Sequence, residues 1–249
     1  MSEKGLVVIT GASSGFGAAT ALRFARLGHP LYLGARRIEK LREVAKKCLE
    51  AGAPKAEARE LDVRSRESIE TFCAGAGTPE ILFNNAGLAL GRDPLDSMKD
   101  EDLLGMVETN VVGLVRVTRA LLPRMIAALR GHVINLGSYA ARGVYEGGAV
   151  YAATKHSVRV ISETLRLELS GTNIRVTEID PGLAETEFSI VRLGDEQKAK
   201  SVYRGLDPLT ADDVADAVVW VATRPPHVNI AELVITPTAQ ASLTKVHRR

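Results

Sequence analysis

Short apolar runs alternate along the chain with longer stretches in which apolar residues recur at helical spacing. Residues 6–9 are apolar at every position, a pattern typical of a strand buried on both faces of a sheet. Comparable runs recur to the end of the chain, bounded by glycine, proline or charged residues. The predicted strands are residues 6–9, 31–33, 56–61, 81–83, 132–136, 174–179 and 232–235.

Helical spacing fills the segments between these strands. The first two helices are closed by Gly28 and Gly52, since glycine commonly ends a helix. Thr210 with Asp213 three residues later fits a capping box at the start of another helix. The predicted helices are residues 18–27, 38–51, 100–130, 150–169 and 211–222.

Strands that alternate with helices predict an α/β fold, with a mostly parallel, doubly wound sheet of seven strands and helices on both faces. The chain has 249 residues and no linker, so we expect one domain over residues 1–249. Its least apolar stretch is residues 189–205, which we interpret either as a solvated surface helix or as a mobile lid over a pocket.

Composition and charge limit which partners and which compartment we expect for this protein. The formal net charge is +2, with Lys and Arg scattered, so we expect no nucleic-acid partner. No apolar run approaches the roughly 18 residues of a membrane span, and no spacing predicts a metal site. A core strand at residues 6–9 leaves no room for a signal peptide. We therefore expect a cytoplasmic protein in which Cys48 and Cys73 are reduced.

A glycine-rich turn, TGASSGFG at residues 10–17, joins the first strand to the first helix. Glycine permits a sharp turn and close approach of the backbone to a ligand, and a helix N-terminus favours a bound phosphate. The spacing G-x-x-x-G-x-G differs from the common G-x-G-x-x-G fingerprint, but the strand–turn–helix context indicates a pyrophosphate cradle. The expected contacts are Gly11, Ser13, Ser14, Gly15, Phe16 and Gly17.

The end of the second strand indicates which dinucleotide the cradle holds. Ala35 stands where an acidic residue would bind a ribose 2′-hydroxyl, and Arg36 and Arg37 follow it. Guanidinium groups suit a 2′-phosphate, so we predict NADP rather than NAD. The alternative is that both arginines are solvated surface charges.

Tyr151 and Lys155 lie four residues apart on a predicted helix, so their side chains share one face. A nearby ammonium favours the phenolate and predicts a phenol pKa below its ordinary value near 10. Such a pair can act as a general acid or base. Ser138 follows the strand at 132–136, where its hydroxyl could hold a substrate oxygen. A surface Tyr–Lys pair is the alternative.

Asn110 is unusual because it lies among valines in a long predicted helix and needs hydrogen-bond partners there. We interpret it either as a structural amide or as the anchor of a water leading to Lys155.

These landmarks together resemble the short-chain dehydrogenase/reductase family over essentially the whole chain. They are residues 10–17, Asp62, residues 84–87, Asn110, Ser138, Tyr151, Lys155 and residues 181–186, all in family order. The resemblance implies a Rossmann fold, bound NAD(P) and hydride transfer with a small-molecule substrate.

The resemblance also implies residue roles. Tyr151 is the proton donor or acceptor, Ser138 positions the substrate oxygen, and Asn110 shapes a proton relay. Lys155 lowers the pKa of Tyr151 and binds the nicotinamide ribose. Further expected dinucleotide contacts are Asp62, Val63, Asn85, Ala86, Gly87, Tyr151 itself, Pro181, Gly182, Leu183 and Thr186.

Shorter matches, such as NNAGLALG at 84–91 and TEFS at 186–189, resemble the NADP-dependent serine/3-hydroxy acid dehydrogenase branch. That branch implies a substrate such as L-serine or allo-threonine. A carboxylate substrate needs a cation, and Arg92, Arg142 and Arg192 are candidates by position. The alternatives are a carbonyl reductase of neutral substrates, an epimerase or dehydratase on the same fold, and a non-catalytic NADP(H) sensor.

The helices at 100–130 and 150–169 are apolar on more than one face, which predicts a dimer or tetramer built on them. A broad helix–helix contact within one chain is the alternative.

Overall fold

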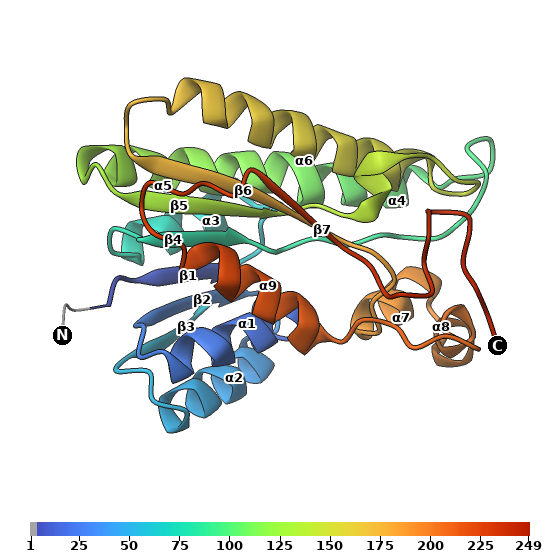
Figure 1. Ribbon diagram of the computed structural model, residues 1–249, viewed down its shortest axis with the longest axis horizontal. Helices are drawn as coiled ribbons and strands as arrows, with labels where there is room; N and C mark the ends of the chain where they lie inside the picture. The colour runs from blue at the N-terminus through green and yellow to red at the C-terminus, as the bar shows by residue number, and fades with distance from the viewer. Residues whose placement is uncertain (1–3) are drawn as a thin grey trace.

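A parallel sheet of seven strands forms the centre of the computed structural model, which describes residues 4–249 (Figure 1). The strand order is β3-β2-β1-β4-β5-β6-β7, and every neighbouring pair is parallel. The order reverses between β1 and β4, which opens a crevice at their carboxyl ends where ligands bind in folds of this kind. The strands are β1 (Val7–Thr10), β2 (Leu31–Ala35), β3 (Ala56–Glu60), β4 (Ile81–Asn84), β5 (Gly131–Leu136), β6 (Ile174–Pro181) and β7 (Glu232–Ile235).

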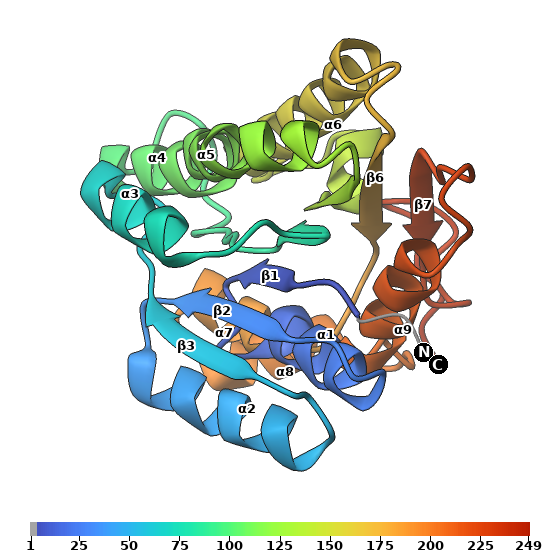
Figure 2. The ribbon, with the colours of Figure 1, turned by 90° about the vertical axis from the view of Figure 1, so that its left-hand side faces the viewer.

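Helices cover both faces of the sheet, giving three layers (Figure 2). One face carries α1 (Gly15–Arg26), α2 (Ile38–Glu50) and α9 (Ala211–Ala222). The other carries α3 (Arg66–Gly75), α4 (Asp100–Val107), α5 (Leu114–Ala127) and α6 (Ala149–Glu168). Short turns of helix complete the set: η1 (Glu108–Gly113), η2 (Tyr139–Arg142), α7 (Glu187–Leu193) and α8 (Glu196–Val202).

The alternation of side chains along each strand separates the core into two halves. Ile9 of β1 packs with Phe24 of α1 on one side of the sheet. Its neighbour Val8 packs with Phe72 of α3 and Leu121 of α5 on the other. Because both faces are buried, the central strands are apolar at nearly every position, which is the pattern that the sequence carries.

The predicted strands are all present, with ends within two residues of those expected, and the capping box of Thr210 and Asp213 is formed. Two helix predictions need correction. The sequence analysis missed α3, whose apolar residues are Ile69, Phe72 and Cys73. The helix predicted over 100–130 is not uniform, because one wide π turn, η1, separates α4 from α5.

The stretch at 189–205 folds mainly as parts of two short helices, α7 and α8, rather than one. These helices and the C-terminal end of the chain lie together at the right-hand end of Figure 1. Across residues 4–249, no helix combines the length and apolar character needed to cross a membrane.

Candidate active site

A cavity of about 560 Å³ lies at the carboxyl ends of the strands. It is bordered by the glycine-rich turn, the ends of β2 to β6, the start of α6, and α7. The structure brings nearly all of the predicted site residues to it: Gly11, Ser13, Ser14, Gly15, Phe16, Arg36, Arg37, Asp62, Val63, Asn85, Ala86, Gly87, Ser138, Tyr151, Lys155, Pro181, Gly182, Leu183 and Thr186.

The glycine-rich turn is held by side chains from β1 and the end of β4. Gly11 and Gly15 have φ of 66° and 54°, a left-handed backbone that glycine adopts without strain. Asn85 Nδ2 donates to the carbonyls of Thr10 at 2.8 Å and Gly11 at 3.0 Å. The Thr10 hydroxyl accepts from the Asn85 and Ala86 amides at 3.1 and 3.0 Å. The turn is therefore fixed before any ligand arrives.

Thr10→Val tests this support with little change of shape. The substitution leaves the amides of Asn85 and Ala86 without their acceptor inside the protein. We expect it to lower the free energy of unfolding by about 1–3 kcal/mol and to weaken dinucleotide binding. Chemical denaturation and a fluorescence titration with NADPH would measure the two effects. The control is Thr20→Val, since Thr20 has a buried hydroxyl in α1 with no hydrogen-bond partner among residues 4–249. Unchanged values for Thr10→Val would contradict this account of the turn.

Gly17 does not line the cavity, which corrects its predicted role as a ligand contact. A Cβ at this position would lie 2.5 Å from Asn85 Nδ2 and 2.7 Å from the Gly11 carbonyl oxygen. Gly17 therefore lets the first turn of α1 pack against the strand ends, behind the surface that a ligand would touch.

Arg36 and Arg37 both lie at the cavity rim, and both are exposed. Arg37 donates to the hydroxyls of Ser13 and Ser14, at 3.2 and 2.6 Å. It also pairs with Glu187 of α7 at 2.8 Å, and Lys40 lies 3.2 Å from the same carboxylate. These cations hold the pKa of Glu187 at about 2. Sequence reasoning missed Glu187, because residues so far apart in the chain give no local signal.

Ser138, Tyr151 and Lys155 converge on the floor of the cavity. Ser138 caps η2, and its hydroxyl accepts the Ala140 amide at 3.1 Å. Lys155 Nζ donates to the Leu136 carbonyl at 2.8 Å and lies 5.9 Å from the centre of the Tyr151 ring. The predicted helix face is confirmed: α6 carries both residues one turn apart. A phenol, a hydroxyl and an ammonium so arranged can hold an oxygen atom and exchange a proton with it.

The expected direction of the Tyr151 pKa shift is wrong for this structure. Burial raises the pKa of Tyr151 to about 12, although the neighbouring Ser138 hydroxyl and Arg192 lower it. Burial also lowers the pKa of Lys155 to about 8, against the opposing effects of Asp180 and Glu178. The sequence indicated the nearby charge but not the loss of water around the phenol, and the second effect is larger.

Asn110 lies in η1 and is almost completely buried, but it does not line the cavity. Its Oδ1 accepts the Leu88 amide and its Nδ2 donates to the Leu88 carbonyl, each at 2.8 Å. Nδ2 also donates to the Thr154 hydroxyl at 3.1 Å. The side chain is therefore committed to the strand-end loop and α6, which favours the structural interpretation of the amide.

Three arginines were candidates for holding a substrate carboxylate, and the structure separates them. Arg142 is outside the cavity lining and pairs with Asp180 and Glu232, so that candidate is wrong. Arg92 lines the cavity from an exposed loop. Arg192 of α7 is half-buried, with its guanidinium 5.4 Å from the centre of the Tyr151 ring and 5.6 Å from that of Tyr145.

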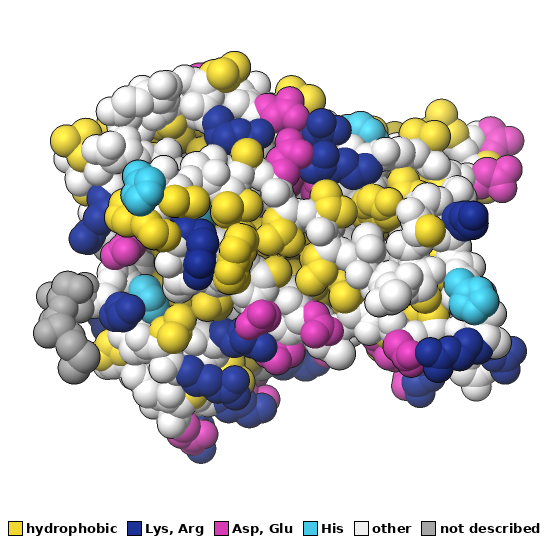
Figure 3. All heavy atoms as spheres, in the orientation of Figure 1, with side chains coloured by type: hydrophobic (Ala, Val, Ile, Leu, Met, Phe, Trp, Pro, Cys, Tyr) yellow, Lys and Arg dark blue, Asp and Glu magenta, His cyan; other side chains and the backbone are white. Residues whose placement is uncertain are grey.

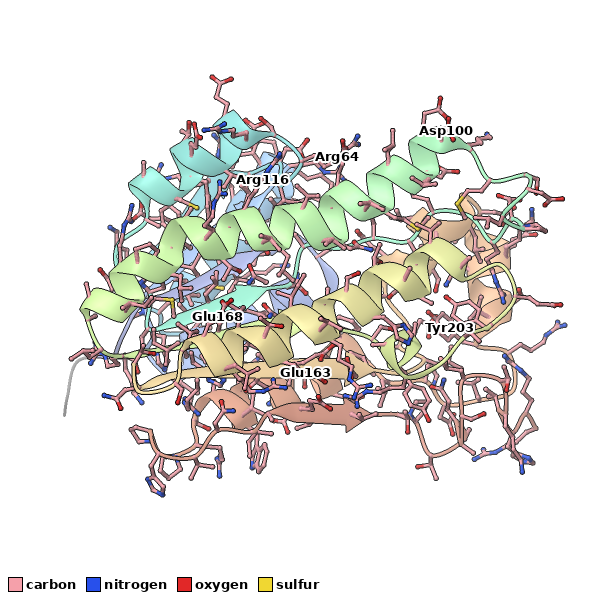
Figure 4. The ribbon with its side chains drawn as sticks, turned by 90° about the horizontal axis from the view of Figure 1, so that it is seen from above. Arg64, Asp100, Arg116, Glu163, Glu168 and Tyr203 are labelled. Carbon is pink, nitrogen blue, oxygen red and sulfur yellow. The ribbon has the colours of Figure 1, made fainter. Side chains whose placement is uncertain are left out.

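The outer wall of the cavity comes from parts of the chain that sequence reasoning did not connect. Tyr203, labelled in Figure 4, joins α7 to the loop after β6: its hydroxyl shares a hydrogen bond with the Ser189 hydroxyl of α7 and donates to the Ala184 carbonyl at 2.7 Å. Gln240 Oε1 accepts the Leu183 amide at 2.7 Å, which fixes the turn after β6. Tyr145, Phe188 and Leu243 also line the cavity.

The chain is similar to known proteins over most of its length. Residues 5–197 match the family described as short chain dehydrogenase. The NADP-dependent 3-hydroxy acid dehydrogenase YdfG of Escherichia coli is 44% identical over 251 residues, covering 98% of this chain and 100% of the relative. Sulfoacetaldehyde reductase of Chromohalobacter salexigens is 45% identical over 243 residues, 94% of each chain. Among solved structures, the closed form of serine dehydrogenase complexed with NADP+ has a TM-score of 0.91 and 45% identity, covering 98% of this chain and 100% of the other.

Proposed function

The chain belongs to the short-chain dehydrogenase family, and from that premise we propose that it is an NADP-dependent oxidoreductase acting on a 3-hydroxy acid. The relatives named above support both the coenzyme and the substrate class. The oxidised carbon would be the one that bears the 3-hydroxyl group, and the reverse reaction would reduce the corresponding carbonyl.

The residues around the cavity fit a phosphorylated dinucleotide. The turn presents the start of α1, with left-handed glycines that keep side chains away from a bound phosphate. Ser13, Ser14, Arg36 and Arg37 supply donors at the rim for a 2′-phosphate. When bound, the coenzyme supplies the hydride acceptor or donor.

The protein's own groups would handle the proton and the substrate oxygen. We assign Tyr151 Oη as the group that takes or gives the hydroxyl proton, and Ser138 as the group that holds the same oxygen. Lys155 would keep a positive charge beside the phenol, which favours the phenolate as the proton leaves. Asn110 would maintain the shape of this site through the Leu88 loop and Thr154.

One observation carries the acid-substrate assignment. Arg192 lies against the Tyr151 ring inside the cavity, and within residues 4–249 its guanidinium donates only to the Gly91 carbonyl and the Tyr145 hydroxyl. A guanidinium without an acidic partner, placed beside the reacting phenol, suits a substrate with an anionic group.

A substrate panel followed by nicotinamide absorbance tests the proposal. NADP would be offered with L-serine, allo-threonine, 3-hydroxypropionate, 3-hydroxyisobutyrate and simple secondary alcohols, and NADPH with sulfoacetaldehyde. NADPH formation on the 3-hydroxy acids is expected. Activity confined to the neutral alcohols would contradict the acid-substrate class, and tight NADPH binding without turnover on any compound would contradict the enzymatic function.

Coenzyme choice gives a separate prediction. We expect Arg37→Asp to weaken NADPH binding by roughly tenfold to a hundredfold, because it removes charge-assisted bonds to the 2′-phosphate, and to leave NADH binding nearly unchanged. Arg36→Asp is expected to act in the same direction. Fluorescence titration with both coenzymes measures the preference, and Arg42→Asp, an exposed charge on α2 outside the cavity, is the control. An unchanged ratio in both variants would mean that these arginines are only surface charges.

We also propose a homo-oligomer, a dimer or tetramer, in the cytoplasm. Helices α4 to α6 lie side by side on one face and expose Leu104, Val115 and Val160 (Figure 4). A second apolar area lies over β7 and α9, where Val234 and Trp220 are exposed (Figure 3). Surfaces of this kind favour association. A monomeric mass by light scattering at micromolar protein would overturn the oligomer, and the free, buried Cys48 and Cys73 suit a reducing compartment.

A further inference from the structure

A group of four charged side chains, two of them completely buried, lies next to Ser138 and outside the lining of the cavity. Glu178 and Asp180 come from β6, Arg142 from η2 and Glu232 from β7. Both β6 carboxyl groups are completely buried. Buried charges are costly unless they are paired or protonated, so the arrangement needs a physical explanation.

Asp180 links this group directly to the site. Its Oδ1 accepts the Ser138 backbone amide at 2.9 Å. Its Oδ2 accepts Arg142 Nε at 2.8 Å, and Arg142 Nη2 lies 2.6 Å from Glu232 Oε2. One carboxylate therefore fixes the backbone of Ser138 and, through Arg142, the helical turn that Ser138 caps.

The backbone next to Ser138 is fitted to these carboxyl groups. A Cβ on Gly137 would lie 2.0 Å from Asp180 Oδ1 and 2.6 Å from Glu178 Oε1. Only glycine allows the strand end to approach so closely. The contact is therefore part of how the end of β5 is positioned.

Glu178 is placed to carry a proton beside Asp180. Within residues 4–249, no N–H or O–H group is hydrogen-bonded to either of its oxygens. Burial and the Asp180 charge raise its pKa to about 8, while Arg142 lowers it and Glu232 raises it. The Lys155 ammonium of α6 also interacts with both carboxyl groups, which raise the pKa of Lys155 against the effect of burial. A protonated Glu178 can donate to Asp180, which leaves the negative charge on Asp180 for Arg142 and the Ser138 amide.

We propose that Asp180 is a positioning residue for the reaction, acting on the Ser138 hydroxyl through the Ser138 backbone amide and held in place by Arg142 and a protonated Glu178. The inference rests on the proposed function, because it assumes that Ser138 holds the substrate oxygen. The proposal also explains the position of Arg142, which pairs with Asp180 and Glu232 and does not line the substrate cavity.

Two substitutions at Asp180 separate its two contacts. Asp180→Asn keeps an oxygen that can accept the Ser138 amide but loses the charge that Arg142 needs, whereas Asp180→Ala removes both. We expect Asp180→Ala to lower kcat roughly a hundredfold and Asp180→Asn to recover part of that loss, since small displacements of an aligned group have effects of this size. The affinity for NADPH, measured by fluorescence titration, should stay unchanged.

Glu232→Gln is the matched control, because it alters the other partner of Arg142 without touching Ser138. It should keep kcat within about twofold of the unmodified enzyme. Normal kcat in folded Asp180→Ala and Asp180→Asn would overturn the proposal while Ser138→Ala remains impaired. If Ser138→Ala is fully active, the proposed function itself is wrong at this residue. Should both Asp180 variants fail to fold, Arg142→Gln replaces them: it removes the side chain that holds Asp180 in place, and a normal kcat in this variant would overturn the proposal.

The proton on Glu178 has its own test, which does not depend on turnover. A carboxyl group whose pKa is higher in the folded than in the unfolded protein loses its stabilising effect as pH rises through that interval. Between pH 5 and 8, we expect the Tm of the unmodified protein to fall more than that of Glu178→Gln. Parallel pH profiles of Tm would contradict a protonated Glu178.

Discussion

Tyr151→Phe is expected to reduce kcat by roughly 10²- to 10⁴-fold, because it removes the hydroxyl that we propose exchanges the substrate proton. Burial raises the pKa of Tyr151 to about 12, so at neutral pH the phenol carries its proton and is ready to donate it in the reductive direction. For the oxidative direction, we propose that the phenol first loses that proton with the help of Lys155 and then accepts the proton of the substrate hydroxyl. The measurement is steady-state turnover in both directions on the best compound of the panel.

Its control is Tyr139→Phe, the same chemical change at another tyrosine that lines the cavity. NADPH affinity should be similar in both variants, because both leave the glycine-rich turn and the two arginines at the rim unchanged. Retention of more than a tenth of the normal kcat by Tyr151→Phe would exclude this phenol as the proton-transferring group.

Arg192→Leu should produce the second large effect, a loss of selectivity rather than of chemistry. Removing a charge-assisted contact to a carboxylate costs about 1.5–3 kcal/mol, which corresponds to a rise in KM for 3-hydroxy acids of roughly tenfold to a hundredfold. Neutral secondary alcohols lack the anionic group, so their KM should change little. The ratio of kcat/KM for the two substrate classes is the quantity to report.

Arg92→Leu is the matched control, since Arg92 lines the same cavity but lies on an exposed loop. If Arg92→Leu rather than Arg192→Leu causes the loss, the anionic group lies on the other side of the cavity. Equal losses on acids and neutral alcohols in Arg192→Leu would indicate damage to the packing against Tyr151 rather than lost recognition of a charge.

Much of the fold could be predicted because its local patterns and its tertiary structure agree. Parallel strands buried on both faces require apolar residues at consecutive positions, and the consecutive apolar residues Val8 and Ile9 of β1 show this pattern in the sequence. Helix α3 was less visible because Ile69, Phe72 and Cys73 form a narrow apolar stripe among polar neighbours. The wide turn at η1 could not be predicted from neighbouring residues, because the groups that hydrogen-bond Asn110 there, Leu88 and Thr154, are distant in the sequence.

The residues of the candidate site also differ in how far the sequence could predict them. The residues brought to the cavity by strand ends could be predicted, because parallel strands all end at one edge of the sheet. Contacts between distant segments could not. From the sequence, Arg142 is a possible substrate-binding cation, but in the structure it pairs with Asp180 and Glu232. The role of Gln240 could not be predicted, because it depends on a hydrogen bond to Leu183, which is 57 residues away in the chain.

Helix α7 has a consequence for how this enzyme can be altered. Its first residue, Glu187, pairs with the arginine proposed to select the coenzyme, and its sixth, Arg192, rests on the ring of Tyr151. Substitutions at Arg37 and Arg192 should therefore have non-additive effects, because both bear on one seven-residue segment. We therefore expect substitutions at Arg37 that shift the preference toward NADH to change the substrate KM as well.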